Sequence, residues 1–172
     1  AFMSYDFIQQ YQYYFSRSDF IGPWTETILA DNYLKPVKVR QTALGMAYNG
    51  LLEVKTEVYL KRYENVLSYR DRVDYYSNRP YEQFTSQGDG LAKGLDVMIK
   101  KSDRNINGWI SYSIGEVQYS IDGVNLGKPF HPAHDIRHKI NILGNYTFNT
   151  KYEISLGWSF HTGAPVELPD GF

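Results

Sequence analysis

Strict alternation of apolar and polar side chains is the feature that most limits what this chain can fold into. It is clearest in KYEISLGWSFH (151–161), where every second residue is large and apolar. In an α-helix these residues would be scattered around the circumference, whereas in a β-strand they share one face. The apolar set is Tyr152, Ile154, Leu156, Trp158 and Phe160. The sequence therefore predicts a strand over 151–161.

Similar runs recur along the chain and predict about seven strands. The last two are separated only by 149–150, which predicts a β-hairpin, and Asn49-Gly50 predicts another hairpin with a two-residue turn. In the first run, the aromatic residues expected to point outward are Tyr5, Phe7, Tyr11 and Tyr13. The predicted strands lie within 3–15, 39–48, 51–63, 90–101, 108–118, 138–148 and 151–161.

Short and long connections alternate between these strands. The short links lie near 49–50, 102–107 and 149–150, and the long ones near 16–36, 66–89 and 119–135. Outer-membrane barrels have this layout, with short periplasmic turns at one rim and long extracellular loops at the other. At about 10 to 13 residues, the predicted strands are also long enough to cross a bilayer at a tilt. The connections therefore favour an antiparallel transmembrane β-barrel.

Alternation alone does not decide which face meets water. A soluble barrel, such as a lipocalin, points its apolar face inward, whereas a membrane barrel points it outward to lipid. Aromatic residues, which make up 16% of the chain, gather toward the predicted strand ends, as in the interfacial girdles of membrane barrels. They are Tyr48, Tyr63, Trp109, Tyr119, Phe148, Tyr152 and Phe160. We therefore prefer a membrane barrel, with a small soluble ligand-binding barrel and a self-contained small outer-membrane barrel as alternatives.

The composition excludes several other classes of protein. No run of about 18 apolar residues occurs, which excludes a helical membrane span. The net charge of −1 gives no electrostatic argument for a nucleic-acid partner. The chain has no cysteine, so we expect no disulfide framework, thiolate nucleophile or cysteine zinc site. Without a nucleophile, an acid–base pair or a metal constellation, the sequence predicts neither an enzyme nor a bound cofactor.

Several motifs follow one another in a fixed order. They are a glycine-rich strand start with an acidic residue, a Gly-Trp-x-Ser-Tyr strand, an Asp-x-Arg-His strand start and a Thr-Gly-x-Pro strand end. The matching residues are Gly90, Gly94 and Asp96, then Gly108, Trp109, Ser111 and Tyr112, then Asp135, Arg137 and His138, and last Thr162, Gly163 and Pro165. In this order the chain resembles the late barrel strands of TonB-dependent receptors, especially the transporter type common in Bacteroidota. The resemblance spans 34–70, 90–120 and 129–166.

The resemblance implies that residues 1–172 are a piece of a larger outer-membrane receptor. Such receptors have barrels of about 22 strands around a plug domain, and this chain would supply about a third of one. We find no plug, no energy-coupling box and no terminal aromatic strand in the sequence. The resemblance further implies a Gram-negative outer membrane, contact with its lipid, and import of a nutrient ligand such as a siderophore, glycan, peptide or cobalamin-like molecule. Energy for import would come from the TonB system through the missing plug.

Aromatic residues in the long loops are the candidate ligand contacts. They are Trp24, Tyr75, Tyr76 and Tyr81, with Tyr33 and Phe84 nearby in the sequence. The alternative is that these loops fold on their own side chains.

Two polar groups could carry chemistry. The segment HPAHDIRH (131–138) holds His131, His134, Asp135 and His138, with His161 on the next strand, and such residues could bind a transition metal. We prefer a hydrogen-bonded strand start formed by Asp135, Arg137 and His138. The carboxylates of Glu53, Glu57, Asp96 and Glu153 could act as acid–base pairs. We prefer ion pairs in an aqueous lumen, with Lys55, Lys61 and Lys100 as their partners.

Overall fold

The computed structural model describes residues 1–16, 25–71 and 81–166, and these residues are almost entirely β-structure. Two short 3₁₀ helices, η1 (Tyr81–Gln83) and η2 (Asn125–Gly127), lie in the connections. None of the helices in the described ranges has the length and apolar character needed to cross a membrane. The strands are β1 (Phe2–Gln10), β2 (Gln12–Ser16), β3 (Thr25–Leu29), β4 (Val37–Asn49), β5 (Glu53–Tyr69), β6 (Thr85–Ser102), β7 (Ile106–Ile121), β8 (His138–Thr147) and β9 (Glu153–His161).

Seven of these strands form one antiparallel sheet in the order β1-β4-β5-β6-β7-β8-β9, and β2 pairs only with β3. Neighbouring strands in the large sheet are therefore also neighbours in sequence, apart from the β2–β3 hairpin between β1 and β4. The sheet is not closed, because β1 pairs only with β4 and β9 pairs only with β8 among the described residues. The all-β, antiparallel class and the seven predicted strands are thus confirmed.

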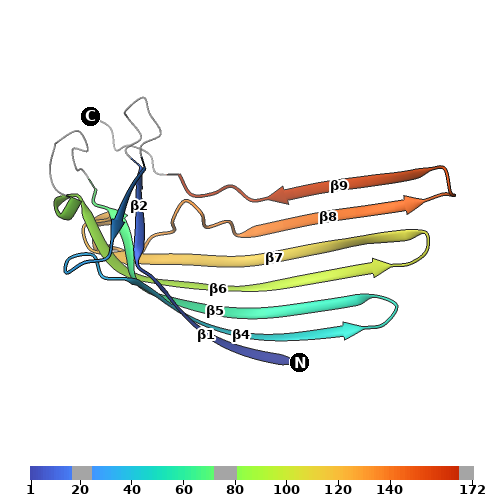
Figure 1. The fold of residues 1–172 in the computed structure, drawn as a ribbon, viewed down its shortest axis with the longest axis horizontal. Coiled ribbons are helices and arrows are strands. Elements are labelled where there is room, and N and C mark those ends of the chain that lie inside the picture. Colours follow the sequence, from blue (N-terminus) through green and yellow to red (C-terminus); the bar gives the residue numbers. More distant parts are fainter. Residues whose placement is uncertain (17–24, 72–80, 167–172) are drawn as a thin grey trace.

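The connections sort to the two ends of the sheet (Figure 1). The hairpin turns β4–β5, β6–β7 and β8–β9 lie at one end, and the longer connections lie at the other with the β2–β3 hairpin. The predicted alternation of short and long links is therefore confirmed. The predicted two-residue turn at Asn49-Gly50 is wrong, because Asn49 pairs with Glu53 and leaves residues 50–52 in the turn.

Several strands extend beyond their predicted ends. The β5 strand continues through an irregularity between Tyr63 and Val66, where Asn65 takes a left-handed φ of 61°. Such a bulge inserts an unpaired residue and reverses the apolar–polar phase, so the alternation appears to stop at Tyr63. The first predicted run, 3–15, is instead divided at Tyr11 between β1 and β2.

Cross-strand pairing places the two sets of side chains on opposite faces of the sheet. One row of directly paired residues runs Tyr48, Val54, Ile99, Ile110, Ile142 and Trp158, and we name this side the apolar face. The adjacent row on the other side runs Ala47, Lys55, Met98, Ser111, Asn141 and Ser159, and we name that side the polar face. The predicted division of side chains between two faces is confirmed.

No second layer covers either face in the described part of the chain. Among the residues whose burial is described, the buried apolar ones are Leu34, Ala43, Ala92, Ile121 and Val124. Leu34 packs against Ala30, Val37, Leu67 and Tyr69 near the end of the sheet that carries the long connections. Large side chains of the apolar face stay exposed on strands throughout the sheet, including Leu44, Met46, Val58, Ile99, Ile110, Ile154, Leu156 and Trp158.

Candidate functional site

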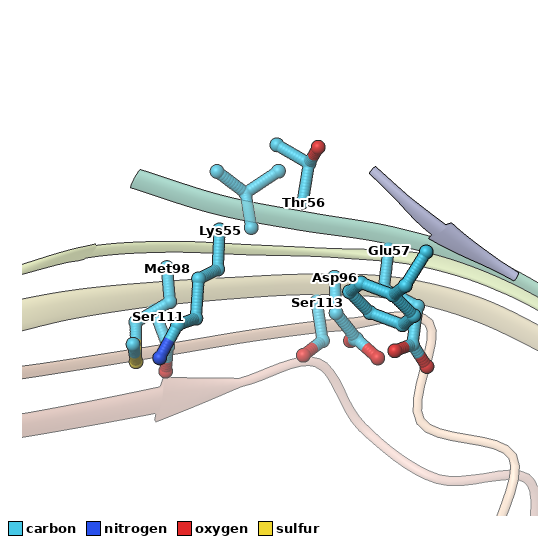
Figure 2. A pocket seen from close by; sticks show the side chains of 9 residues that line it. Lys55, Thr56, Glu57, Asp96, Met98, Ser111 and Ser113 are labelled. Carbon is cyan, nitrogen blue, oxygen red and sulfur yellow. The ribbon is translucent and has the colours of Figure 1, made fainter. Parts of the chain in front are cut away.

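A shallow hollow of about 170 Å³ lies on the polar face of the sheet, over the parts of β5, β6 and β7 nearer the hairpin turns. Figure 2 shows its labelled side chains projecting to one side, apart from Thr56, which projects to the other. The residues on the polar side are Lys55, Glu57, Asp96, Met98, Ser111 and Ser113, with Phe2 of β1. Val97, like Thr56, lines the hollow from a position on the apolar face. The hollow thus brings together two carboxylates, an ammonium group and two hydroxyls on the polar face, which the sequence predicts to contact water.

The charged residues of the polar face are only partly paired as predicted. The Glu53 carboxylate lies 2.6 Å from Lys55 Nζ and 3.9 Å from Lys100 Nζ. Glu57 stands directly opposite Asp96 on the next strand. No ion pair is formed by Glu57, Asp96 or Glu153 within the described ranges. The predicted ion pairs are therefore confirmed for Glu53, and the structure does not form them at the other three carboxylates.

Lys61, the third predicted cation, instead lies over an aromatic ring, with its Nζ 5.0 Å from the ring centre of Tyr59. Tyr59 itself extends over two glycines. A Cβ added to Gly94 would lie 2.5 Å from the Tyr59 hydroxyl, and one added to Gly115 would lie 3.1 Å from it. These glycines leave room for the ring of Tyr59 to lie flat on the polar face. Packing of an aromatic ring over a glycine stabilises that glycine within a strand.

Hydrogen bonds link side chains across three strands of the polar face. Asn141 Nδ2 on β8 donates to Ser111 Oγ on β7 at 3.3 Å, and Ser159 Oγ on β9 donates to Asn141 Oδ1 at 2.9 Å. This row fixes the lateral spacing of β7, β8 and β9 with neutral polar groups. It also leaves further donor and acceptor capacity directed toward solvent.

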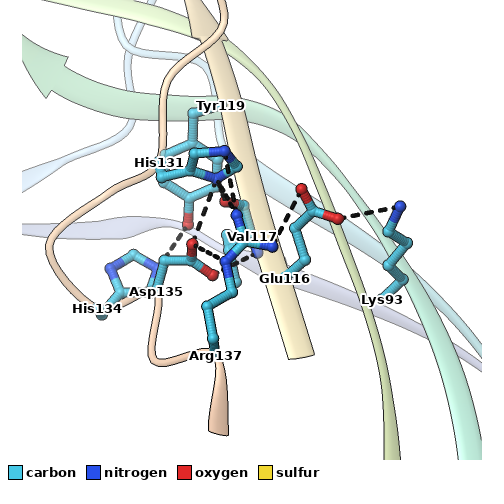
Figure 3. Close-up of polar contacts among 8 residues, drawn as sticks. All are labelled: Lys93, Glu116, Val117, Tyr119, His131, His134, Asp135 and Arg137. Carbon is cyan, nitrogen blue, oxygen red and sulfur yellow. Dashed lines mark hydrogen bonds and ion pairs between the residues drawn. The ribbon is translucent and has the colours of Figure 1, made fainter. Parts of the chain in front are cut away.

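The segment before β8 forms a polar cluster around the buried carboxylate of Asp135 (Figure 3). Asp135, only 2% exposed, accepts a 2.8 Å hydrogen bond from the backbone N–H of Val117 and pairs with Arg137 Nε at 3.0 Å. His131 Nδ1 lies 2.7 Å from the Val117 carbonyl oxygen. With a proton on Nδ1, this histidine donates to that carbonyl and leaves Nε2 to accept from Arg137 Nη2 at 3.2 Å.

This cluster completes the edge of β7, whose pairing with β8 reaches only to Ile114. Beyond that residue, the Gly115 N–H donates to the Arg137 carbonyl, and Tyr119 exchanges both backbone hydrogen bonds with Phe130. The side chains of Asp135 and His131 bond the backbone of Val117, which lies between them. Side-chain groups thus replace a missing strand and satisfy backbone polar groups that would otherwise lose a partner. The predicted hydrogen-bonded strand start at Asp135 and Arg137 is confirmed.

A chain of ion pairs continues from Arg137 across the sheet. Arg137 Nη1 lies 3.1 Å from Glu116 Oε1, and Lys93 Nζ lies 3.0 Å from Glu116 Oε2. Glu116 therefore links two cations beyond the apolar rows of β6 and β7.

The histidines considered as metal ligands lie with separate partners. His134 Nε2 is 3.2 Å from the Tyr119 hydroxyl, and His138 Nδ1 is 2.8 Å from the Tyr112 hydroxyl. His161 Nδ1 is 3.0 Å from the carbonyl oxygen of Thr162. Across residues 1–16, 25–71 and 81–166, no three His, Cys, Asp or Glu side chains converge as a metal site would require.

Most of the aromatic residues predicted to contact a ligand cannot be placed. Trp24, Tyr75 and Tyr76 lie outside the described residues, and Tyr81 is placed only as the first residue of η1. The nearby Tyr33 hydroxyl donates to the Glu82 carbonyl at 2.6 Å. The ring of Phe84 stacks on that of Tyr69 at a centroid distance of 6.0 Å. Tyr33 and Phe84 therefore follow the alternative in which the loops pack on their own side chains.

No family model, curated protein or solved structure matches this chain. The likeness to TonB-dependent receptors therefore stays a resemblance, carried by the order of the sequence motifs. The described residues thus form one open sheet with an apolar face and a polar face. The buried carboxylate of Asp135 stabilises the edge of β7 beyond its pairing with β8.

Sequence reasoning missed the contacts that depend on cross-strand register. The tyrosine–glycine contacts could have been found from the spacing of Gly90 and Gly94, which matches that of Tyr59 and Tyr63 on the paired strand. No sequence signal identified Val117 as the partner of Asp135.

Proposed function

We propose that this sheet forms part of the wall of a transmembrane β-barrel in the bacterial outer membrane. In this arrangement the apolar face contacts hydrocarbon and the polar face lines an aqueous interior. The observation that carries the proposal is that large apolar side chains cover one face of the sheet and stay exposed there. Exposed apolar surface of this extent is costly in water, whereas lipid covers it at no cost.

The height of the apolar rows supports a membrane span. On β6, Lys93 and Lys101 enclose Leu95, Val97 and Ile99 on the same face. From one lysine to the other the strand rises ~27 Å at ~3.4 Å per residue, or ~21 Å along the membrane normal at a tilt of ~40°. Outer-membrane barrels have an apolar band of about 25 Å, flanked by polar and aromatic residues. The lysines would therefore stand at the two interfaces.

The two open edges support a place within a larger barrel. Strands β1 and β9 each leave one row of backbone groups without a strand partner in the described sheet, and unpaired backbone is not tolerated in hydrocarbon. Further strands on both sides would satisfy these groups. A lipocalin-like barrel would need a closed sheet with its apolar side chains inside, and a self-contained small membrane barrel would also need closure. Neither alternative is favoured by a specific contact.

For the biological role, we infer import by a TonB-dependent receptor, and the order of motifs over 34–70, 90–120 and 129–166 supports this inference. The polar face would then line the path of a nutrient ligand, and the residues around Lys55, Glu57 and Asp96 would contact it through hydrogen bonds and charge. No covalent step is required of them. Import of this kind uses energy delivered through TonB from the inner membrane. Uptake that persists after the inner membrane is de-energised would contradict this role.

Site-directed spin labels test the orientation of the two faces. The chain has no cysteine, so single labels can be placed with Ile110→Cys on the apolar face and Ser111→Cys beside it on the polar face. In lipid vesicles, the label at 110 should be accessible to oxygen dissolved in the bilayer, and the label at 111 to a water-soluble nickel reagent. Ile154→Cys and Ser155→Cys on β9 should repeat the pattern. The reversed pattern on both strands would refute the proposed orientation.

A further inference from the structure

Two arginines stand directly opposite each other at the outer edge of the apolar rows. Arg40 on β4 pairs in register with Arg62 on β5, so both side chains leave the same face, and both are exposed. Like charges in directly paired positions destabilise a sheet. Arg40 is compensated by Glu64, whose Oε1 lies 2.7 Å from its Nη2. Within the described ranges, Arg62 has no carboxylate at ion-pair distance.

The surroundings of this arginine pair are apolar on one side and charged on the other. Toward the middle of the sheet, the face continues with Leu60 and Val58, which are 37% and 56% exposed. Leu91 lies beside Arg62 on β6. Toward the long connections, the same face carries Lys38, Glu64 and Asp89. Lys93, which pairs with Glu116, lies beside Leu60 on β6. A ligand that fits must therefore combine an anionic group with an apolar body.

We propose that Arg40 and Arg62 bind the phosphate of a lipid headgroup, whose acyl chains lie over Leu60 and Val58. This inference rests on the proposed membrane location, in which these arginines stand where the hydrocarbon ends. Guanidinium groups bind phosphate oxygens through paired, charge-assisted hydrogen bonds, and an anion between two arginines removes their mutual repulsion. A free phosphate would use the arginines alone, whereas a lipid also covers the exposed leucine and valine beneath them.

Binding of the full chain to vesicles tests this proposal. Arg62→Gln removes the uncompensated cation, and Lys61→Gln is the matched control, because it removes the same charge from the adjacent residue on the opposite face. Co-flotation gives the ratio of binding to phosphatidylglycerol vesicles over phosphatidylcholine vesicles. Loss of one cation near a lipid surface costs about 1 kcal/mol, so Arg62→Gln should lower that ratio about fivefold. Lys61→Gln should leave it unchanged.

The outcomes separate this inference from the function on which it rests. Failure of the unaltered chain to insert into phosphatidylcholine vesicles would overturn the membrane proposal and this one with it. Normal insertion with equal effects of the two substitutions would overturn only the lipid site, because the effect would then follow net charge. If inorganic phosphate at constant ionic strength abolishes the effect of Arg62→Gln, the site binds free phosphate and the lipid proposal is wrong.

Discussion

At the scale of single residues, Asp135 is the side chain on which the rim of the sheet depends most. It is almost fully buried and holds both the Val117 N–H and Arg137. Asp135→Asn keeps the size of the side chain but removes its charge, so Arg137 loses a buried partner. We expect a loss of about 2 to 3 kcal/mol in the free energy of unfolding, measured by urea titration in detergent micelles.

The matched comparison for Asp135 is Glu116→Gln, which removes a carboxylate of the same ion-pair chain. The Glu116 side chain is 32% exposed, so water replaces much of what it loses, and we expect a clearly smaller loss of stability than in Asp135→Asn. Hydrogen exchange at the Val117 amide adds a local measurement. It should accelerate in Asp135→Asn and stay unchanged in Glu116→Gln. Equal losses of stability in the two variants would show that burial of Asp135 is not what matters.

At the scale of the strand, the contact between Tyr59 of β5 and Gly94 of β6 makes the glycine necessary. A Cβ at Gly94 would lie 2.5 Å from the Tyr59 hydroxyl and 2.8 Å from the backbone oxygen of Ile114. Because a backbone atom cannot move aside cheaply, Gly94→Ala should destabilise the sheet by about 1 to 3 kcal/mol. Gly144→Ala on β8 is the control, since nothing lies within 4 Å of its added Cβ. Similar urea midpoints for the two variants would contradict this account.

The strands themselves were largely predictable, because alternation reports directly which residues share a face. All seven strands of the large sheet were predicted, and the register confirms their apolar sets, as in the pairing of Ile142 with Trp158. What alternation misses are places where its phase changes. The bulge at Asn65 hid the last part of β5, and the turn after Asn49 is longer than the Asn-Gly pair predicts. The sequence also joined most of β2 to the first predicted run and placed β3 in the long link near 16–36.

At the scale of the whole molecule, the open sheet has consequences that no single strand shows. The sequence predicts two faces of opposite character, and the structure confirms them, but the same alternation serves a soluble barrel and a membrane barrel. Membrane orientation therefore stays a prediction. The candidate site was less predictable than the fold, because contacts such as Asp135 with Val117 join residues 18 positions apart through a particular register. The loop aromatics predicted to bind a ligand remain mostly outside the described residues.

Because the sheet is open, the association state of the chain in water tests whether its apolar face is exposed. With an exposed apolar face and two unpaired edges, the chain should form large assemblies without detergent and a single species in micelles, as measured by sedimentation velocity. Lysine substitutions on β9 distinguish the contribution of the apolar face from that of the unpaired edge. Ile154→Lys with Trp158→Lys places charge on the apolar face, and Ser155→Lys with Ser159→Lys places it on the polar face of the same edge.

Both pairs of lysines disturb edge-to-edge association, but only the first pair opposes burial of the apolar face in lipid. The cost of a lysine on that face rises with depth and reaches about 2 to 4 kcal/mol near the bilayer centre. We therefore expect both variants to assemble less in water, and only the Ile154 and Trp158 variant to lose insertion into vesicles. A monodisperse, monomeric chain in detergent-free buffer would instead mean that the apolar face is covered by the protein itself. The membrane wall would then have to be abandoned, because a face already covered by protein cannot meet hydrocarbon.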